Sequence, residues 1–263
     1  MMKLSISNIG WEEKNDEAVY EMMIDSGFEG VEIAPTRVIV DRPYDRIYEA
    51  KKWADNIKRK YGLVIPSMQS IWYGRKEQIF GSQEELLFLI DYSKKAIDFA
   101  KAIGCKNLVF GCPRNRNKPS DAEENRAIVF LKEIGDYAYS QSTIIGMEAN
   151  PSIYNTNYIN DTKSALDLIE IVNSQGFKLN LDIGTMIANE EDISIISGKE
   201  NLINHVHICE PFLEPIKERK IHSEIREILV ACGYEGFVSI EVKKQDDINA
   251  LKKMITYIGE VFK

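Results

Sequence analysis

Short runs rich in β-branched residues alternate with longer amphipathic segments along the whole chain. The short runs predict strands, and apolar residues that recur every three or four positions predict helices. Two predicted helices open with a capping box, Ser82 with Glu85 and Ser120 with Glu123. The expected strands are 4–9, 31–33, 63–65 leading into 67–70, 107–111, 144–148, 178–183, 203–208 and 238–242. The expected helices are 16–26, 44–61, 82–103, 120–140, 161–174, 192–197, 222–232 and 246–262.

Eight strand–helix units in this order predict a parallel sheet, because parallel neighbours need a crossover between them. The mean repeat in the 263-residue chain is about 33 residues, close to the unit of a (β/α)8 TIM barrel. We therefore expect an α/β fold in which residues 1–263 form a single barrel domain. The competing doubly wound sheet usually carries a glycine-rich phosphate turn after its first strand, and residues 8–11 (Asn-Ile-Gly-Trp) lack that pattern.

Charge and composition narrow the function classes. A formal net charge of −8 argues against a nucleic-acid partner, since a phosphate backbone must be met by a basic surface. The four cysteines form no C-x-x-C pair and are expected to be free thiols in a reducing compartment. The N-terminus lacks a signal-peptide pattern, and no apolar run approaches the roughly 20 residues that span a bilayer. We expect a cytoplasmic protein without a membrane partner.

Metal-ligand residue types stand at the ends of four consecutive predicted strands: Glu148, Asp182, His207 and Glu241. Their separations of 34, 25 and 34 residues each correspond to about one unit, so the four side chains should lie at one level of adjacent strands. Three carboxylates in a partly dry cleft repel one another unless a cation neutralises them. The pattern favours a divalent metal, and Mn²⁺, Mg²⁺ and Zn²⁺ all accept such donors. His205 lies deeper on the same strand face, as a supporting or core residue.

Several segments around these residues carry a family resemblance, namely 30–36, 68–70, 110–116, the strand of Glu148, 205–207 and 239–241. Over essentially its whole length, the chain resembles the xylose isomerase-like barrel superfamily, in particular the sugar phosphate isomerase/epimerase group. The resemblance implies that Glu148, Asp182, His207 and Glu241 are the metal ligands.

In keto-sugar epimerases of this superfamily, the two glutamates also exchange protons with opposite faces of the substrate, while the metal polarises a carbonyl and an adjacent hydroxyl. The resemblance therefore implies a catalytic role for Glu148 and Glu241. Two positions depart from the family pattern. Thr185 stands where many members have a histidine, and Leu213 stands where epimerases of free ketoses have an arginine.

Other polar residues near the predicted strand ends are candidates for substrate binding. Arg114, Asn115 and Arg116, helped by Lys118, can hold a phosphate or carboxylate after strand four, although a solvated basic loop explains them equally well. Gln69 follows strand three, where the aromatic pair at 72 and 73 can stack on a sugar or cover the barrel top. The remaining candidates are Asn150 after strand five, Lys243 after strand eight, and His222 near a helix start.

The favoured function is a metal-dependent isomerase or epimerase of a small sugar, sugar phosphate or related hydroxy-carbonyl compound, acting by proton transfer through a stabilised enediolate. Alternatives on the same scaffold are a phosphodiesterase of the endonuclease IV type, a dehydratase of a cyclic polyol or shikimate-type acid, and a non-catalytic binding protein. The three histidines of the chain are few for the phosphodiesterase. The sequence leaves the substrate, the metal and any homo-oligomer open.

Overall fold

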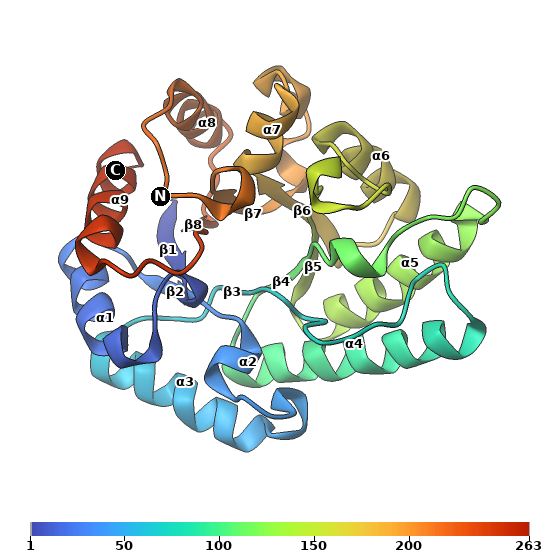
Figure 1. Ribbon diagram of the computed structural model, residues 1–263, viewed down its shortest axis with the longest axis horizontal. Coiled ribbons are helices and arrows are strands. Elements are labelled where there is room, and N and C mark those ends of the chain that lie inside the picture. Colours follow the sequence, from blue (N-terminus) through green and yellow to red (C-terminus); the bar gives the residue numbers. More distant parts are fainter. Residues whose placement is uncertain (1, 263) are drawn as a thin grey trace.

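The computed structural model describes residues 2–262 and shows eight parallel strands surrounded by helices (Figure 1). The pairing order is β2-β1-β8-β7-β6-β5-β4-β3, and parallel bridges Gly30–Val64 and Ile33–Met68 link the two ends of this sheet into a nearly closed barrel. The predicted single-domain (β/α)8 fold is therefore confirmed. The strands are β1 Lys3–Ser7, β2 Gly30–Glu32, β3 Ser67–Met68, β4 Asn107–Phe110, β5 Ile144–Met147, β6 Phe177–Asp182, β7 Ile203–Ile208 and β8 Phe237–Ile240.

The helices form the outer ring in Figure 1 and press apolar faces onto the strands. The long helix α4, for example, buries Leu89, Ile97 and Ala100, which recur at helical spacing on one side. No helix within residues 2–262 combines the length and apolar character needed to cross a bilayer. The helices are α1 Asp16–Asp25, α2 Pro35–Val38, α3 Ile47–Tyr61, α4 Gln83–Ile103, α5 Glu124–Ser140, α6 Thr162–Val172, α7 Ile183–Asn189, α8 Lys220–Ala231 and α9 Ile248–Val261.

Of the two capping boxes predicted at helix starts, the structure contains one. Ser82 caps α4 as expected, since its hydroxyl accepts from the backbone N of Glu85 and the Glu85 carboxylate accepts from the backbone N of Ser82. The second predicted capping box, at Ser120, is wrong. Residues 119–122 form a turn instead, with the N–H of Ala122 donating to the carbonyl of Pro119, and α5 begins only at Glu124.

The segment after β6 differs most from the prediction. The α-helix α7 follows β6 directly, whereas the expected helix 192–197 is a 3₁₀ turn at Ile193–Ile196. Asp182 caps α7, because its carboxylate accepts from the backbone N of Thr185 at 2.5 Å. The same side chain thus ends a strand, starts a helix and faces the top of the barrel.

Candidate metal centre

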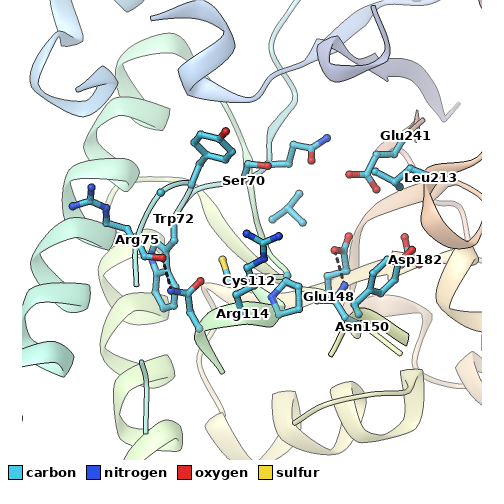
Figure 2. A pocket seen from close by; sticks show the side chains of 18 of the residues that line it. Ser70, Trp72, Arg75, Cys112, Arg114, Glu148, Asn150, Asp182, Leu213 and Glu241 are labelled. Atoms are coloured by element: carbon cyan, nitrogen blue, oxygen red, sulfur yellow. Dashed lines mark hydrogen bonds between the residues drawn. The ribbon is translucent and has the colours of Figure 1, made fainter. Parts of the chain in front are cut away.

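Four acidic and imidazole side chains converge at the carboxyl ends of β5 to β8, as their spacing predicts. Glu148 and Glu241 each lie one residue beyond β5 and β8, and Asp182 pairs in register with His207 across β6 and β7. One ligand atom from each residue lies within 4.8 Å of the others. Glu148, Asp182 and Glu241 also line a cavity of about 770 Å³ at this end of the barrel (Figure 2).

The ring of His207 lies between Glu32 on one side and the pair Glu148 and Glu241 on the other. Its Nε2 lies 2.9 Å from Oε2 of Glu32, and its Nδ1 lies 2.9 Å from Oε1 of Glu148 and 3.3 Å from Oε2 of Glu241. Although burial disfavours the charged ring, these carboxylates raise the pKa of His207 well above its ordinary value. The Nδ1 atom is fully buried and makes no aligned hydrogen bond with any residue from 2 to 262.

The three carboxylates that face Nδ1 are also perturbed. Burial, together with the charge of Glu148, raises the pKa of Asp182 to about 6. Burial likewise raises the pKa values of Glu148 and Glu241, and the nearby His207 only partly offsets it. Without a cation, the cluster therefore resists full ionisation near neutral pH.

Neighbouring side chains fix the orientation of the carboxylates of Glu148 and Asp182. Asn180 donates to Oε1 of Glu148 at 2.8 Å, and Asn150 donates to Oε2 at 3.3 Å. Cys209 donates through its thiol to Oδ2 of Asp182, with Sγ and Oδ2 2.9 Å apart. Such supporting contacts are typical of metal-binding carboxylates, because they hold the ligand oxygens in place before the ion arrives.

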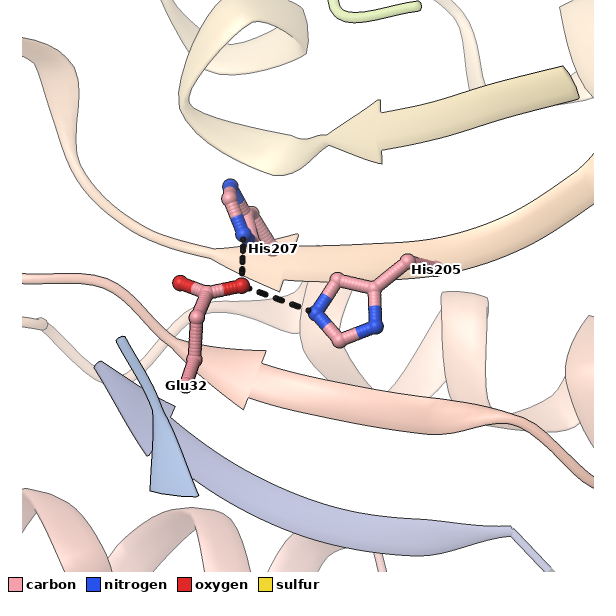
Figure 3. A group of neighbouring side chains, drawn as sticks. All are labelled: Glu32, His205 and His207. Atoms are coloured by element: carbon pink, nitrogen blue, oxygen red, sulfur yellow. Dashed lines mark hydrogen bonds and ion pairs between the residues drawn. The ribbon is translucent and has the colours of Figure 1, made fainter. Parts of the chain in front are cut away.

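Glu32, at the end of β2, is the main residue that sequence reasoning missed. It is completely buried, and Figure 3 shows its carboxylate between the rings of His207 and His205, whose Nε2 lies 3.2 Å away. Burial alone would raise its pKa, but the charge of His207 and contacts with both histidines outweigh burial and lower it. Gln69 donates to its other oxygen at 3.3 Å. The supporting place predicted for His205 agrees with this arrangement.

A divalent cation fits the cavity-side group. Nδ1 of His207, which makes no aligned hydrogen bond within residues 2–262, and three carboxylates point to one place, and the cavity leaves room for further ligands. Glu32 and His205 form a second cluster with His207, but neither lines the cavity. Glu32 therefore lies behind His207, where a carboxylate can orient the imidazole of a candidate metal ligand.

Four of the predicted substrate-binding residues line the cavity: Gln69, Arg114, Asn115 and Asn150. The Asn115 amide is occupied by the protein itself, because it donates to the carbonyls of Arg75 and Glu77 at 3.2 and 2.9 Å. Gln69 is tied to Ser7 at 2.6 Å as well as to Glu32.

Three other predicted substrate-binding residues do not line the cavity, and the structure gives each of their side chains a partner within the protein. Arg116 is completely buried and donates to the carbonyl of Glu148 at 3.0 Å and to Oδ1 of Asn150 at 2.8 Å. His222 is buried in α8, with Nδ1 2.9 Å from the hydroxyl of Tyr257. Lys243 forms an ion pair with Glu214. The helper Lys118 also pairs elsewhere, with Glu124 at 3.3 Å.

The two departures from the family pattern lie close to the centre. Thr185 donates to the carbonyl of Ala149 at 2.8 Å, while its backbone N binds Asp182. Leu213 lines the cavity together with Tyr154 and Cys209, two residues that sequence reasoning did not single out. This side of the cavity is thus partly apolar.

The fold and the ligand cluster define a parallel barrel with a carboxylate-and-histidine centre at its carboxyl end. The chain belongs to the xylose isomerase-like TIM barrel family, whose model matches residues 21–258. A search of curated proteins by sequence finds no significant match.

Solved structures of low sequence identity share the fold. A 3-keto-D-glucoside 4-epimerase from E. coli is 19% identical, with a TM-score of 0.78 over 98% of this chain and 99% of its own. D-psicose 3-epimerase from Clostridium cellulolyticum H10, solved with D-tagatose, is 17% identical, with a TM-score of 0.79 over 99% and 98%. A family 2 AP endonuclease from Brucella melitensis is 18% identical, with a TM-score of 0.74 over 98% and 99%.

Proposed function

We propose that the protein is a divalent-metal-dependent isomerase or epimerase of a small sugar or related hydroxy-carbonyl compound. The observation that carries the proposal is the placement of Glu148 and Glu241. They come from β5 and β8, line the same cavity and approach the same nitrogen of His207 (Figure 2). Several solved structures of the same fold are sugar epimerases, which supports this reading.

The two glutamates suit proton transfer at a carbon next to a carbonyl. Both carboxyl groups line the cavity, where a positioned carboxylate can take a proton from a substrate carbon and return it. One glutamate would remove the proton from one face of the carbon, and the other would deliver a proton to the opposite face. A cation held by Glu148, Asp182, His207 and Glu241 would stabilise negative charge that develops on the substrate oxygens.

The proposal is tested by deuterium incorporation. Purified protein with Mn²⁺ is incubated in D₂O with D-fructose, D-tagatose and D-ribulose, and the substrate carbons are followed by NMR. Glu148→Gln and Glu241→Gln should each lower exchange by about 10²–10⁴-fold while metal remains bound, because glutamine keeps an oxygen ligand but cannot act as a base. Glu214→Gln, an exposed glutamate outside the cavity, is the control. Wild-type exchange rates in both cavity variants would reject the two-base mechanism.

The phosphodiesterase alternative is kept because one structure of the same fold is an AP endonuclease. The net charge of −8 and the three histidines of the chain weigh against it. Incubation of the metal-loaded protein with a duplex that contains one abasic site decides the matter. Cleavage that requires the metal and weakens with salt would favour the phosphodiesterase over the epimerase.

A further inference from the structure

Three asparagine side chains form a continuous hydrogen-bonded chain inside the barrel. Asn204 donates to Oδ1 of Asn107 at 2.8 Å, and Asn107 donates to Oδ1 of Asn180 at 3.2 Å. Asn180 in turn donates to Oε1 of Glu148 at 2.8 Å. Barrel interiors are usually filled by layers of branched apolar side chains. This amide chain, Asn204–Asn107–Asn180, replaces such packing with a polar path that ends on Glu148.

The donors of the amide chain all point the same way. A carboxylate can only accept, so Asn180 presents its NH₂ group to Glu148 and its oxygen to Asn107. The same reasoning fixes the amide of Asn107, whose oxygen accepts from Asn204. Aligned hydrogen bonds polarise one another in a buried setting, and both Asn107 and Asn180 are buried. Each link therefore strengthens the bond that Asn180 makes with the carboxylate.

The backbone of β7 is adapted to bring Asn204 into the amide chain. Asn204 and Asn107 come from β7 and β4, which are not neighbours in the sheet. Between Leu179 and Asn180 of β6, the register with β7 shifts and skips Asn204. An irregularity of this kind re-aims a side chain that would otherwise follow the alternation of the strand. The shift thereby accounts for the contact of Asn204 with a strand on the other side of the sheet order.

Gly146 of β5 leaves the space that the amide chain crosses. A Cβ atom at this position would lie 2.5 Å from Oδ1 of Asn107 and 3.1 Å from Cβ of Asn180. Real Cβ atoms do not come as close to another atom as the first of these distances, so any side chain here would displace Asn107. Because β5 lies between β4 and β6, its glycine allows amides from the two flanking strands to meet.

We propose that the amide chain positions Glu148 from the opposite end of the barrel, fixing Oε1 beside His207 and leaving Oε2 to face the substrate. Asn107 and Asn204 stand at the amino ends of their strands. Oε1 lies 2.9 Å from Nδ1 of His207, whereas Oε2 accepts a longer bond of 3.3 Å from Asn150 on the cavity wall (Figure 2). The role of Oε2 toward a substrate rests on the proposed function, but the fixation of Oε1 does not.

The three asparagines are positioning residues, because none of them lines the cavity. NMR of their side-chain amides tests the chain without metal or turnover. In metal-free protein, Glu148→Gln replaces the final acceptor by a neutral amide, so the NH₂ signals of Asn180, Asn107 and Asn204 should all shift, by decreasing amounts. The NH₂ signal of Asn56, exposed on α3, should stay in place. A shift confined to Asn180 would overturn the proposal.

Mn²⁺ affinity, measured by competition with a chelator, tests the effect on the metal centre. Asn180→Leu should weaken binding by about 10–100-fold, and Asn204→Leu, at the far end of the amide chain, severalfold. Ser67→Ala is the matched control, since its hydroxyl accepts from Asn107 at 3.0 Å but lies off the path to Glu148. Leu229→Ala in α8 controls for lost stability alone. Both controls should bind Mn²⁺ like the wild type, and wild-type affinity in folded Asn204→Leu would reject the amide chain.

The two proposals fail separately. If the amide shifts reach Asn204 but the wild-type protein neither binds Mn²⁺ nor exchanges deuterium, the proposed function is rejected and the amide chain stands. If the wild type exchanges deuterium while the shifts stop at Asn180, the amide chain is rejected and the proposed function stands. Because the NMR measurement needs only Glu148→Gln, it decides the matter even where a leucine variant does not fold.

Discussion

Oε2 of Glu32 lies 2.9 Å from Nε2 of His207, and both side chains are fully buried (Figure 3). The contact assigns the proton of a neutral imidazole to Nε2 and leaves the Nδ1 lone pair facing the three cavity carboxylates. Glu32 therefore determines which nitrogen of His207 is available to a metal.

Glu32→Gln should weaken Mn²⁺ binding by about 10–100-fold, because the amide cannot hold the imidazole as strongly as a carboxylate does. Competition with a fluorescent chelator measures the affinity directly and does not depend on activity. Glu29→Gln, on the exposed side of the same segment, serves as control and should bind metal normally. An unaltered affinity in Glu32→Gln would mean that the histidine is positioned by the strand alone.

Metal affinity should rise with pH. The ion requires ionised carboxylates and an unprotonated Nδ1, yet the pKa of Asp182 is raised to about 6 and that of His207 well above its ordinary value. Binding must therefore release protons. Calorimetry in two buffers of different ionisation enthalpy at pH 5.5 and 7.5 counts them, and pH-independent affinity would contradict the expectation.

The same pKa values predict the stability of the metal-free protein. In the native state, Asp182 keeps its proton above its ordinary pKa of 3.8 and His207 keeps its proton above its ordinary pKa of 6.5. The unfolded chain releases these protons at lower pH, so the free energy of unfolding falls as pH rises from each ordinary pKa to the raised native value. Added Mn²⁺ should therefore raise Tm more at pH 7.5 than at pH 5.5. A thermal shift that is larger at the lower pH would contradict this linkage.

Gly111→Ala should damage the metal centre more than the fold. A Cβ at this position would lie 2.7 Å from Oε2 of Glu148 and 3.3 Å from Oδ1 of Asn150, so the carboxylate must move. We expect weaker Mn²⁺ binding in the chelator assay and a loss of stability of about 1–3 kcal/mol. Gly259→Ala in α9 is the control: its nearest contact would be 3.4 Å, and alanine favours a helix. Equal metal affinity in both variants would contradict the prediction.

Arg116 and Arg114 should have opposite sensitivities to substitution. Arg116→Met keeps much of the volume but removes hydrogen bonds to three buried acceptors, the third being the carbonyl of Ile159 at 3.3 Å. Chemical denaturation should show a loss above about 2 kcal/mol, whereas Arg114→Met should stay within about 0.5 kcal/mol. The reverse order would return Arg116 to the substrate site.

The barrel and the four candidate metal ligands at its cavity follow from periodicity in the sequence. Each repeat places its strand end at the same level, so Glu148, Asp182, His207 and Glu241 could be grouped without coordinates. Glu32 could not be grouped with them. It is a single acid in an apolar run, and β2 and β7 are not neighbours in the sheet, so its contact with His207 exists only once the barrel has curved round.

The geometry of loops and helix caps also could not be predicted from the hydrophobic pattern. The helix α7 starts because Asp182 folds back onto the N–H of Thr185, which overrides the unfavourable glycine at 184. Arg116 and Arg114 are two positions apart and chemically alike, but one enters the protein and the other the cavity. The turn that separates them begins at Cys112 with a φ of +44°, a value that hydrophobic patterning does not predict.

The pairing of β1 with β8 sets the order of events during biosynthesis. Leu4 meets Val238 across this pair, so β1 can pair early with β2, but its other edge stays open until residues 237–240 have been synthesised. Glu241, directly after that late strand, is the last of the four candidate ligands to be synthesised. A newly made chain can therefore bring its four candidate metal ligands together only when the barrel closes. An ion that binds only this closed form would stabilise chains whose barrel has closed and would not stabilise chains that are still incomplete.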